Sequence, residues 1–235
     1  VYLLLPNIQA GRVNSSHGAN TVGLDQRYVS GPLQVDELNA GGNRREVDVY
    51  RLNLSLSAQP ELVPIAGFES LPILKLRRSD KPGATPEIDK SYIPPLLNSS
   101  SFSGLHEDIL VAACSQIGSF AREQAEKLTT LGGWDAAQSP EFLKTLLQLN
   151  AANGCYPYLL KLIESRATHP FLLYSELCRL VGALAFMLPD WQPPLLPTYD
   201  HDNLGEVFRA VHNEINTALQ AAGGAHRVVR FPFAG

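Results

Sequence analysis

Residues 99–120 read SSSFSGLHEDILVAACSQIGSF, and they decide the fold because the spacing of apolar residues changes within them. Before this stretch, apolar residues tend to alternate with polar ones, which is the period of a β-strand. After it, they recur at the helical period of about 3.6 residues. The serine-rich segment 99–104 is therefore predicted to separate a β-rich domain, residues 1–98, from a helical domain, residues 105–222.

The helical part contains four amphipathic segments, predicted to begin near Leu105, Ser139, His169 and Asp202. The first ends at Leu131, before Gly132-Gly133, and the last ends at Ala222. Ser139-Pro140 and His169-Pro170 are helix starts, because proline fits the first helical turn. The second helix contains Gly154 and Pro157, so it either bends or divides there. Four such segments with short joints predict an antiparallel four-helix bundle.

The β-rich part consists of short apolar runs separated by glycine and proline. Glu46–Leu56 alternates along its length, which predicts a strand with at least one buried face. Phe68–Leu76 and Ile88–Ile93 are predicted as further strands, the second stopped by Pro94-Pro95. Several short strands of this kind favour a sandwich-like β-domain, here a partial one. The predicted class is α+β, a β-sandwich-like domain followed by the helical bundle.

Composition excludes several functions. The net charge is −4, and the adjacent arginine pairs Arg44-Arg45 and Arg77-Arg78 point to opposite faces of a strand, so nucleic acid is not a predicted partner. No apolar run reaches the roughly 18 residues of a membrane span. The three cysteines form no paired metal or disulfide motif and fit a reducing compartment. Glycine pairs lack the frames of phosphate-binding loops, and no cofactor is predicted.

The densest polar cluster is Tyr199-Asp200-His201-Asp202. Aspartate and histidine are common metal ligands and proton carriers, so a metal-dependent hydrolase centred on Asp200, His201 and Asp202 is one hypothesis. Four consecutive residues do not converge on one ion, however, and no distant ligand pair completes them. The favoured interpretation is capping of the fourth helix, with no catalytic, cofactor-binding or metal-binding residue.

The helical part also carries a spaced pattern that resembles a known family. Its motif residues are His169, Pro170, Tyr174, Gly182, Tyr199, Asp200, His201, Asp202 and Phe208. The β-rich part agrees in shorter pieces: Arg27-Tyr28, Gly67-Phe68 with Leu71-Pro72-Ile73, and Tyr92-Ile93-Pro94-Pro95. Together they resemble TssK, also called ImpJ or VasE, a baseplate subunit of the bacterial type VI secretion system.

The resemblance implies a cytoplasmic, homotrimeric structural adaptor without catalytic activity, docked at the inner membrane. In the family a β shoulder joins the baseplate wedge proteins TssF and TssG, a helical bundle follows, and a C-terminal head reaches the inner-membrane proteins TssL and TssM. We therefore expect a fragment that holds the later part of the shoulder, the whole bundle and, in residues 226–235, the start of a head domain that is otherwise missing.

Overall fold

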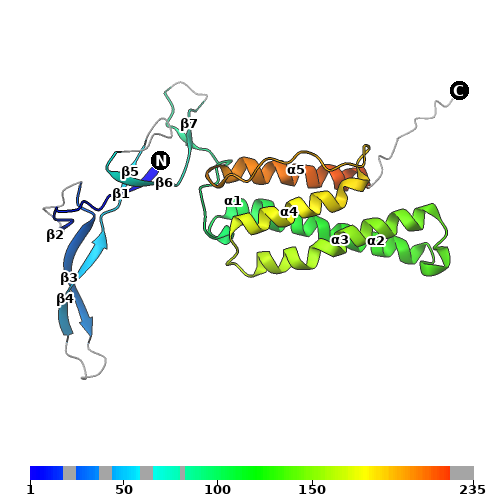
Figure 1. Cartoon of the computed structure of the whole chain (residues 1–235), viewed down its shortest axis with the longest axis horizontal. Coiled ribbons are helices and arrows are strands. Elements are labelled where there is room, and N and C mark those ends of the chain that lie inside the picture. Colours follow the sequence, from blue (N-terminus) through cyan, green and yellow to red (C-terminus); the bar gives the residue numbers. More distant parts are fainter. Residues whose placement is uncertain (18–24, 37–43, 59–65, 80–82, 223–235) are drawn as a thin grey trace. The chain divides into compact units, whose positions relative to one another are not determined.

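A computed structural model describes residues 1–17, 25–36, 44–58, 66–79 and 83–222. The chain divides into two compact units, Val1–Asp89 and Lys90–Gly235 (Figure 1). The first unit is built from small sheets and the second from packed helices, which confirms the predicted α+β class. The division falls earlier than residues 99–104, because Ile93 is buried in the helical core.

The first unit holds its described strands in three small sheets. The strands are β1 (Tyr2–Pro6), β2 (Ser15–His17), β3 (Tyr28–Asp36), β4 (Arg44–Leu52), β5 (Ser55–Ser57), β6 (Phe68–Pro72), β7 (Leu76–Arg77) and β8 (Glu87–Ile88). The sheet orders are β5-β1-β6, β2-β3-β4 and β7-β8. β1 alternates in burial, with Tyr2 and Leu4 turned inward, as expected for a half-buried strand. The predicted strand Ile88–Ile93 is wrong beyond Ile88.

Arg27 ties the two three-stranded sheets together. It lies just before β3, and its guanidinium donates to the Pro6 carbonyl at 2.9 Å and to both carboxylate oxygens of Glu69, at 2.9 and 3.2 Å. Pro6 ends β1 and Glu69 belongs to β6. The Arg27 hydrogen bond holds the pKa of the Glu69 carboxyl below its ordinary value.

Beyond their pairing with the short strand β2, β3 and β4 continue as a two-stranded ribbon that extends away from the rest of the first unit (Figure 1). All nine residues of each strand are paired, from Tyr28 with Leu52 to Asp36 with Arg44. The buried face predicted for Glu46–Leu56 is not found. Val47 is 46% exposed and Leu56 68% exposed, and the segment is interrupted between β4 and β5.

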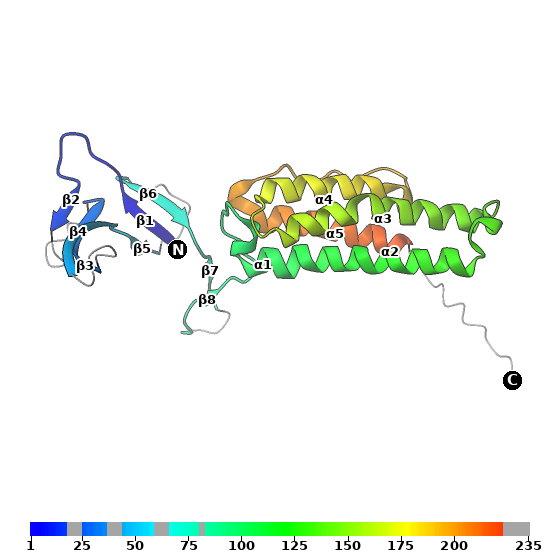
Figure 2. The ribbon, with the colours of Figure 1, turned by 90° about the horizontal axis from the view of Figure 1, so that it is seen from below.

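The second unit is a bundle of four long helices (Figures 1 and 2). Its elements are a short 3-10 turn (Ser99–Ser101), α1 (Ser103–Leu105), a π-helical turn (His106–Val111), α2 (Ala112–Thr130), α3 (Pro140–Glu164), α4 (Pro170–Leu184) and α5 (Leu204–Ala222), with further 3-10 turns at Gly133–Ala136, Ala185–Met187 and His201–Asn203. Sequential helices pack on one another, and Ile117, Leu159, Leu177 and Phe208 are among the fully buried side chains between them.

The predicted helix starts are confirmed. The Ser139 hydroxyl accepts from the Phe142 amide at 3.0 Å, and Pro140 occupies the first turn of α3. The second helix does not divide, since α3 is continuous through Pro157. The predicted strand in residues 226–233 lies outside the described residues.

One described helical segment, Pro170–Met187, is apolar and long enough to cross a membrane. Of this segment, 44% is buried, because α4 packs against α3 and α5.

Candidate functional site

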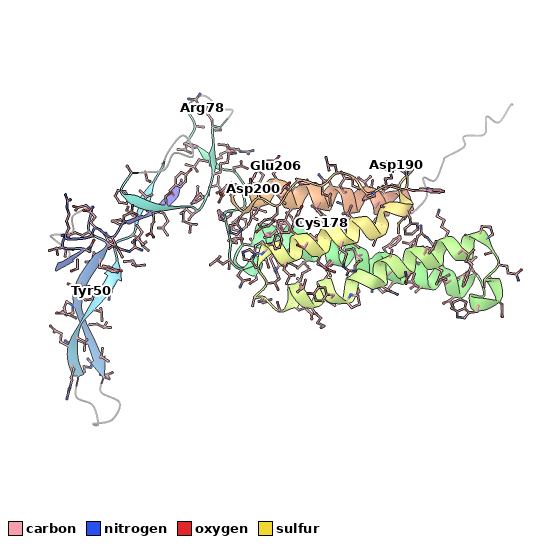
Figure 3. The ribbon with its side chains drawn as sticks, viewed as in Figure 1. Tyr50, Arg78, Cys178, Asp190, Asp200 and Glu206 are labelled. Carbon is pink, nitrogen blue, oxygen red and sulfur yellow. The ribbon has the colours of Figure 1, made fainter. Side chains whose placement is uncertain are left out.

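Most of the motif residues meet at one end of the bundle, at the start of α4 and at the 3-10 turn that precedes α5. His169 caps α4: its Nδ1 accepts from the Phe171 amide at 3.2 Å. Asp200 caps the 3-10 turn that leads into α5, since its carboxylate accepts from the Asp202 amide at 3.0 Å. Figure 3 marks Asp200 at this end of the bundle and Cys178 farther along α4. Two helix starts are therefore joined by a single cluster, the His–Tyr cluster of His169, Tyr174, Tyr199 and His201.

Histidine rings from the two helix starts stack within this cluster. The rings of His169 and His201 lie 5.4 Å apart at an interplanar angle of 8°. His201 Nδ1 is 2.7 Å from the Tyr199 hydroxyl. Burial raises the pKa of Tyr199 to about 12, with the Asp200 charge adding to it. The hydroxyl therefore keeps its proton at neutral pH, and its contact with His201 Nδ1 is a hydrogen bond between the two side chains.

Tyr174 holds the proline-rich connection against the bundle. Its hydroxyl donates to the Pro197 carbonyl at 2.5 Å, and burial raises its pKa to about 12. Its ring packs against Tyr199 at 5.4 Å and edge-on against the fully buried Phe208 at 6.4 Å. The extended segment is thus fixed by one hydrogen bond and by aromatic packing.

This geometry is that of a structural joint. The Asp200 carboxylate is engaged with the backbone and His201 with Tyr199, so each is held by a local partner. Within the described ranges, no group of three or more histidine, cysteine, aspartate or glutamate side chains is placed to hold a metal ion. The arrangement supplies capping and packing, and no feature of it favours the hydrolase hypothesis.

Gly182 is the motif residue that does not join the cluster. It lies in the second half of α4 on the exposed surface, and a Cβ there would meet nothing within 4 Å. Phe171, which directly follows the His169-Pro170 cap and belongs to the same sequence pattern, packs edge-on against Tyr199 at 5.1 Å.

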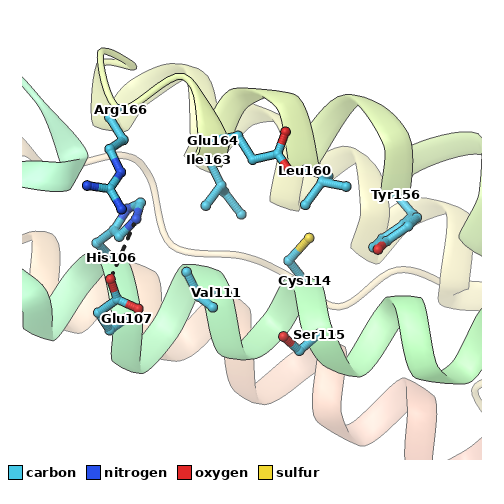
Figure 4. Close-up of a pocket in the computed structure, with 10 residues that line it drawn as sticks. All are labelled: His106, Glu107, Val111, Cys114, Ser115, Tyr156, Leu160, Ile163, Glu164 and Arg166. Carbon is cyan, nitrogen blue, oxygen red and sulfur yellow. Dashed lines mark ion pairs between the residues drawn. The ribbon is translucent and has the colours of Figure 1, made fainter.

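A second feature, which sequence reasoning did not find, is a hollow of about 450 Å³ between the π-helical turn, α2 and the end of α3 (Figure 4). Its lining includes His106, Cys114, Tyr156, Glu164 and Arg166. His106 Nε2 lies 3.8 Å from the Glu107 carboxylate. Burial raises the pKa of the Cys114 thiol, so it is held as a thiol and is a poor nucleophile. Burial raises the pKa of Cys155 and Cys178 as well.

Comparison with known proteins gives a family for this architecture. Residues 1–234 match the family model described as bacterial type VI secretion proteins EvfL, ImpJ and VasE. No curated protein matches the sequence at a significant level. Several solved structures do match this chain. One is a type VI secretion TssK-TssF-TssG baseplate subcomplex, with 26% identity and a TM-score of 0.75 over 94% of this chain and 67% of that one.

Two further structures share the fold. A baseplate complex from the type VI secretion system matches at 25% identity and a TM-score of 0.75, covering 93% of this chain and 68% of the other. A crystal structure of TssK matches at 22% identity and a TM-score of 0.74, covering 93% of this chain but only 50% of the other. The chain therefore belongs to the TssK (ImpJ/VasE) family of type VI secretion baseplate proteins.

Proposed function

We propose that the protein is a non-enzymatic adaptor that joins the baseplate wedge to the inner-membrane complex as a homotrimer. The observation that carries this proposal is the family match over residues 1–234, together with the likeness to a chain of a TssK-TssF-TssG subcomplex. The wedge partners are TssF and TssG, and the membrane-side partners are TssL and TssM, contacted through a C-terminal head. The adaptor works in the cytoplasm, docked at the inner membrane.

We also propose a structural role for each segment of the chain. Residues 1–98 serve as the later part of the shoulder, residues 105–222 as the bundle at the centre, and residues 226–235 as the start of the head. The His–Tyr cluster and its neighbours Pro170, Asp200 and Asp202 serve as the joint that fixes two helix starts and the connection between them.

The composition of α3 supports self-assembly of the bundle. One side of this helix is buried within the chain, with Phe142 and Leu159 nearly inaccessible. The other side is apolar as well: Leu143, Leu147 and Tyr158 are 51%, 56% and 49% exposed. A helix that is apolar on opposite sides is usually buried on both, so a second surface is expected to cover the outer side.

A second stripe runs along the outer side of α4 and into the 3-10 turn that follows it. Leu172, Ser175, Arg179, Gly182 and Phe186 follow one another at alternating spacings of three and four, which is the spacing of a coiled-coil seam, and Leu172 and Phe186 are its large apolar residues. The stripes meet where an Arg179 guanidinium nitrogen donates to the Gly154 carbonyl of α3 at 3.0 Å. We call this the α3/α4 face, made of the three α3 residues above, Gly154 and the α4 stripe.

The two glycines of the face support close approach by another helix. A Cβ at Gly154 or Gly182 would meet nothing within 4 Å, so packing within the chain does not require glycine there. Glycine inside a helix costs about 1 kcal/mol relative to alanine. Contact with a neighbouring copy, backbone close to backbone, explains why both positions remain without a side chain.

The test is mass in solution as a function of concentration, for the wild-type protein and two variants. Gly182→Leu fills the open position and should lower the trimer fraction, because the added side chain separates the helices. Asn213→Leu adds the same side chain to an exposed position of α5 and should leave the mass unchanged. A wild-type protein that stays monomeric at every concentration contradicts self-assembly. An unchanged trimer in Gly182→Leu contradicts the use of this face.

A further inference from the structure

The hollow between the π-helical turn, α2 and the end of α3 contains a buried ring nitrogen that has no partner in the chain. His106 is 7% exposed, and its Nδ1 makes no hydrogen bond to any described residue. Its Nε2 lies 3.8 Å from a Glu107 oxygen, which is too far for a hydrogen bond. Because a buried polar atom without a partner lowers stability, His106 needs an explanation other than packing within this chain. His106 also begins the π-helical turn, a conformation that is rare and often found at functional sites.

Arg166 is a second residue of the hollow whose presence is unfavourable for the fold alone. It is the second residue after α3, and its φ of 52° lies in the left-handed region, where glycine is usual at the end of a helix. The Asn98 side-chain amide and the Ser100 hydroxyl donate to the Arg166 carbonyl at 2.6 and 2.9 Å, which fixes this backbone conformation. Glycine would adopt it without strain. The arginine side chain is therefore expected to have a use of its own.

The Arg166 guanidinium is the charge of the hollow that takes part in no ion pair. Figure 4 shows Arg166 extending from the end of α3 toward His106 and Glu107. Among the described residues Arg166 forms no ion pair, whereas the Glu164 carboxylate is paired with Lys161 at 2.5 Å. A positive charge and an unpaired imidazole nitrogen therefore lie at the same end of the hollow.

The remaining lining selects the kind of ligand. Val111, Leu160 and Ile163 form an apolar wall, which suits an aliphatic chain. A carboxylate accepts two parallel hydrogen bonds from a guanidinium and has lone pairs left for an imidazole N–H. Glu107 and Glu164 are exposed and also line the hollow, so a doubly charged phosphate would meet more repulsion than a carboxylate with one charge. The chemistry of the lining therefore fits an aliphatic carboxylate.

We propose that the hollow binds a carboxylate carried on an aliphatic body. The Arg166 guanidinium pairs with the carboxylate, His106 donates to it from Nδ1, and the aliphatic body lies on the apolar wall. The same chemistry has two sources: a free aliphatic acid, or the C-terminal carboxylate of a polypeptide whose last residue is apolar. This binding site is independent of the adaptor function proposed above, and it gives His106 and Arg166 the partner that the described chain does not supply.

Titration calorimetry on the whole protein tests the site with two acids. The probes are isocaproate and a short acetylated peptide that ends in Leu-Leu with a free C-terminus, and their controls are isocaproamide and the amidated peptide. We expect at least one acid to bind, and its amide to bind at least about tenfold more weakly, because the amide has no charge for the guanidinium. Binding of isocaproate assigns the site to free acids, and binding of the peptide alone assigns it to polypeptide C-termini. No binding by either acid, or equal binding of acid and amide, overturns the inference.

Two variants separate a binding role from a structural one. Arg166→Gly removes the guanidinium and suits the left-handed backbone, and His106→Phe keeps a buried ring without the unpaired nitrogen. We expect both to bind the acid at least about tenfold more weakly, with urea midpoints equal to wild type or higher. Lys144→Gln removes an exposed cation elsewhere on α3 and should change the affinity by less than about threefold. Wild-type affinity in Arg166→Gly or His106→Phe overturns the inference. A lower urea midpoint in both also overturns it, because the fold would then explain the two residues.

Discussion

Replacing Tyr174 by phenylalanine tests whether the His–Tyr cluster is a structural joint. The change removes one oxygen, and with it the 2.5 Å hydrogen bond to the Pro197 carbonyl, while the ring can keep its contacts with Tyr199 and Phe208. A lost bond of this kind costs about 0.5–1.5 kcal/mol, and the partly buried Pro197 carbonyl left without a donor adds to that cost. We expect a loss of about 1–2 kcal/mol in the free energy of unfolding.

Urea unfolding followed by helical circular dichroism measures this loss, at one fixed protein concentration because self-assembly links stability to concentration. Tyr50→Phe is the matched control, since Tyr50 is 62% exposed on β4, outside the α3/α4 face, and should change stability by less than about 0.5 kcal/mol. Equal stability of Tyr174→Phe and wild type would refute the view that this bond holds the proline-rich connection.

Two other predictions concern single positions. Ser139→Ala removes the cap whose hydroxyl accepts from the Phe142 amide at 3.0 Å, and should cost about 1 kcal/mol of unfolding free energy. A matched Ser→Ala change at exposed Ser119 provides the control, and an equal effect of the two would contradict capping. Burial lowers the pKa of His212 below 6.5, so between that value and its lowered pKa the unfolded chain binds more protons than the folded one. Stability should therefore fall as the pH drops below 6.5, and His212→Gln should make the fall shallower in urea titrations at pH 7 and pH 5. An identical pH dependence in that variant would show that other groups are responsible.

The helical half could be predicted from the sequence because its signals are local. Proline after Ser139 and after His169 fixes the starts of α3 and α4, and the 3.6-residue period fixes their inner faces. The His–Tyr cluster was predictable only in part. Its members were identified as a pattern, but the stacking of His169 on His201 depends on how α4 and α5 pack.

The β half was harder to predict because its alternation was interpreted as burial within one chain. The alternation of Glu46–Leu56 is real in β4, but the apolar side that it defines stays open. Ile93 was mispredicted for a different reason. Its apolar run predicts a strand, but tertiary packing places the residue in the helical core. The π-helical turn at His106–Val111 left no sequence signal that distinguishes it from α-helix.

We propose that this member of the TssK family works as a trimeric link in the baseplate. The most direct test is the mass of the complex that the protein forms with TssF and TssG of the same bacterium, measured in solution on purified components. We expect one co-eluting complex whose mass requires the chain in multiples of three. Elution of the protein as a monomer, apart from a TssF–TssG complex, would contradict it.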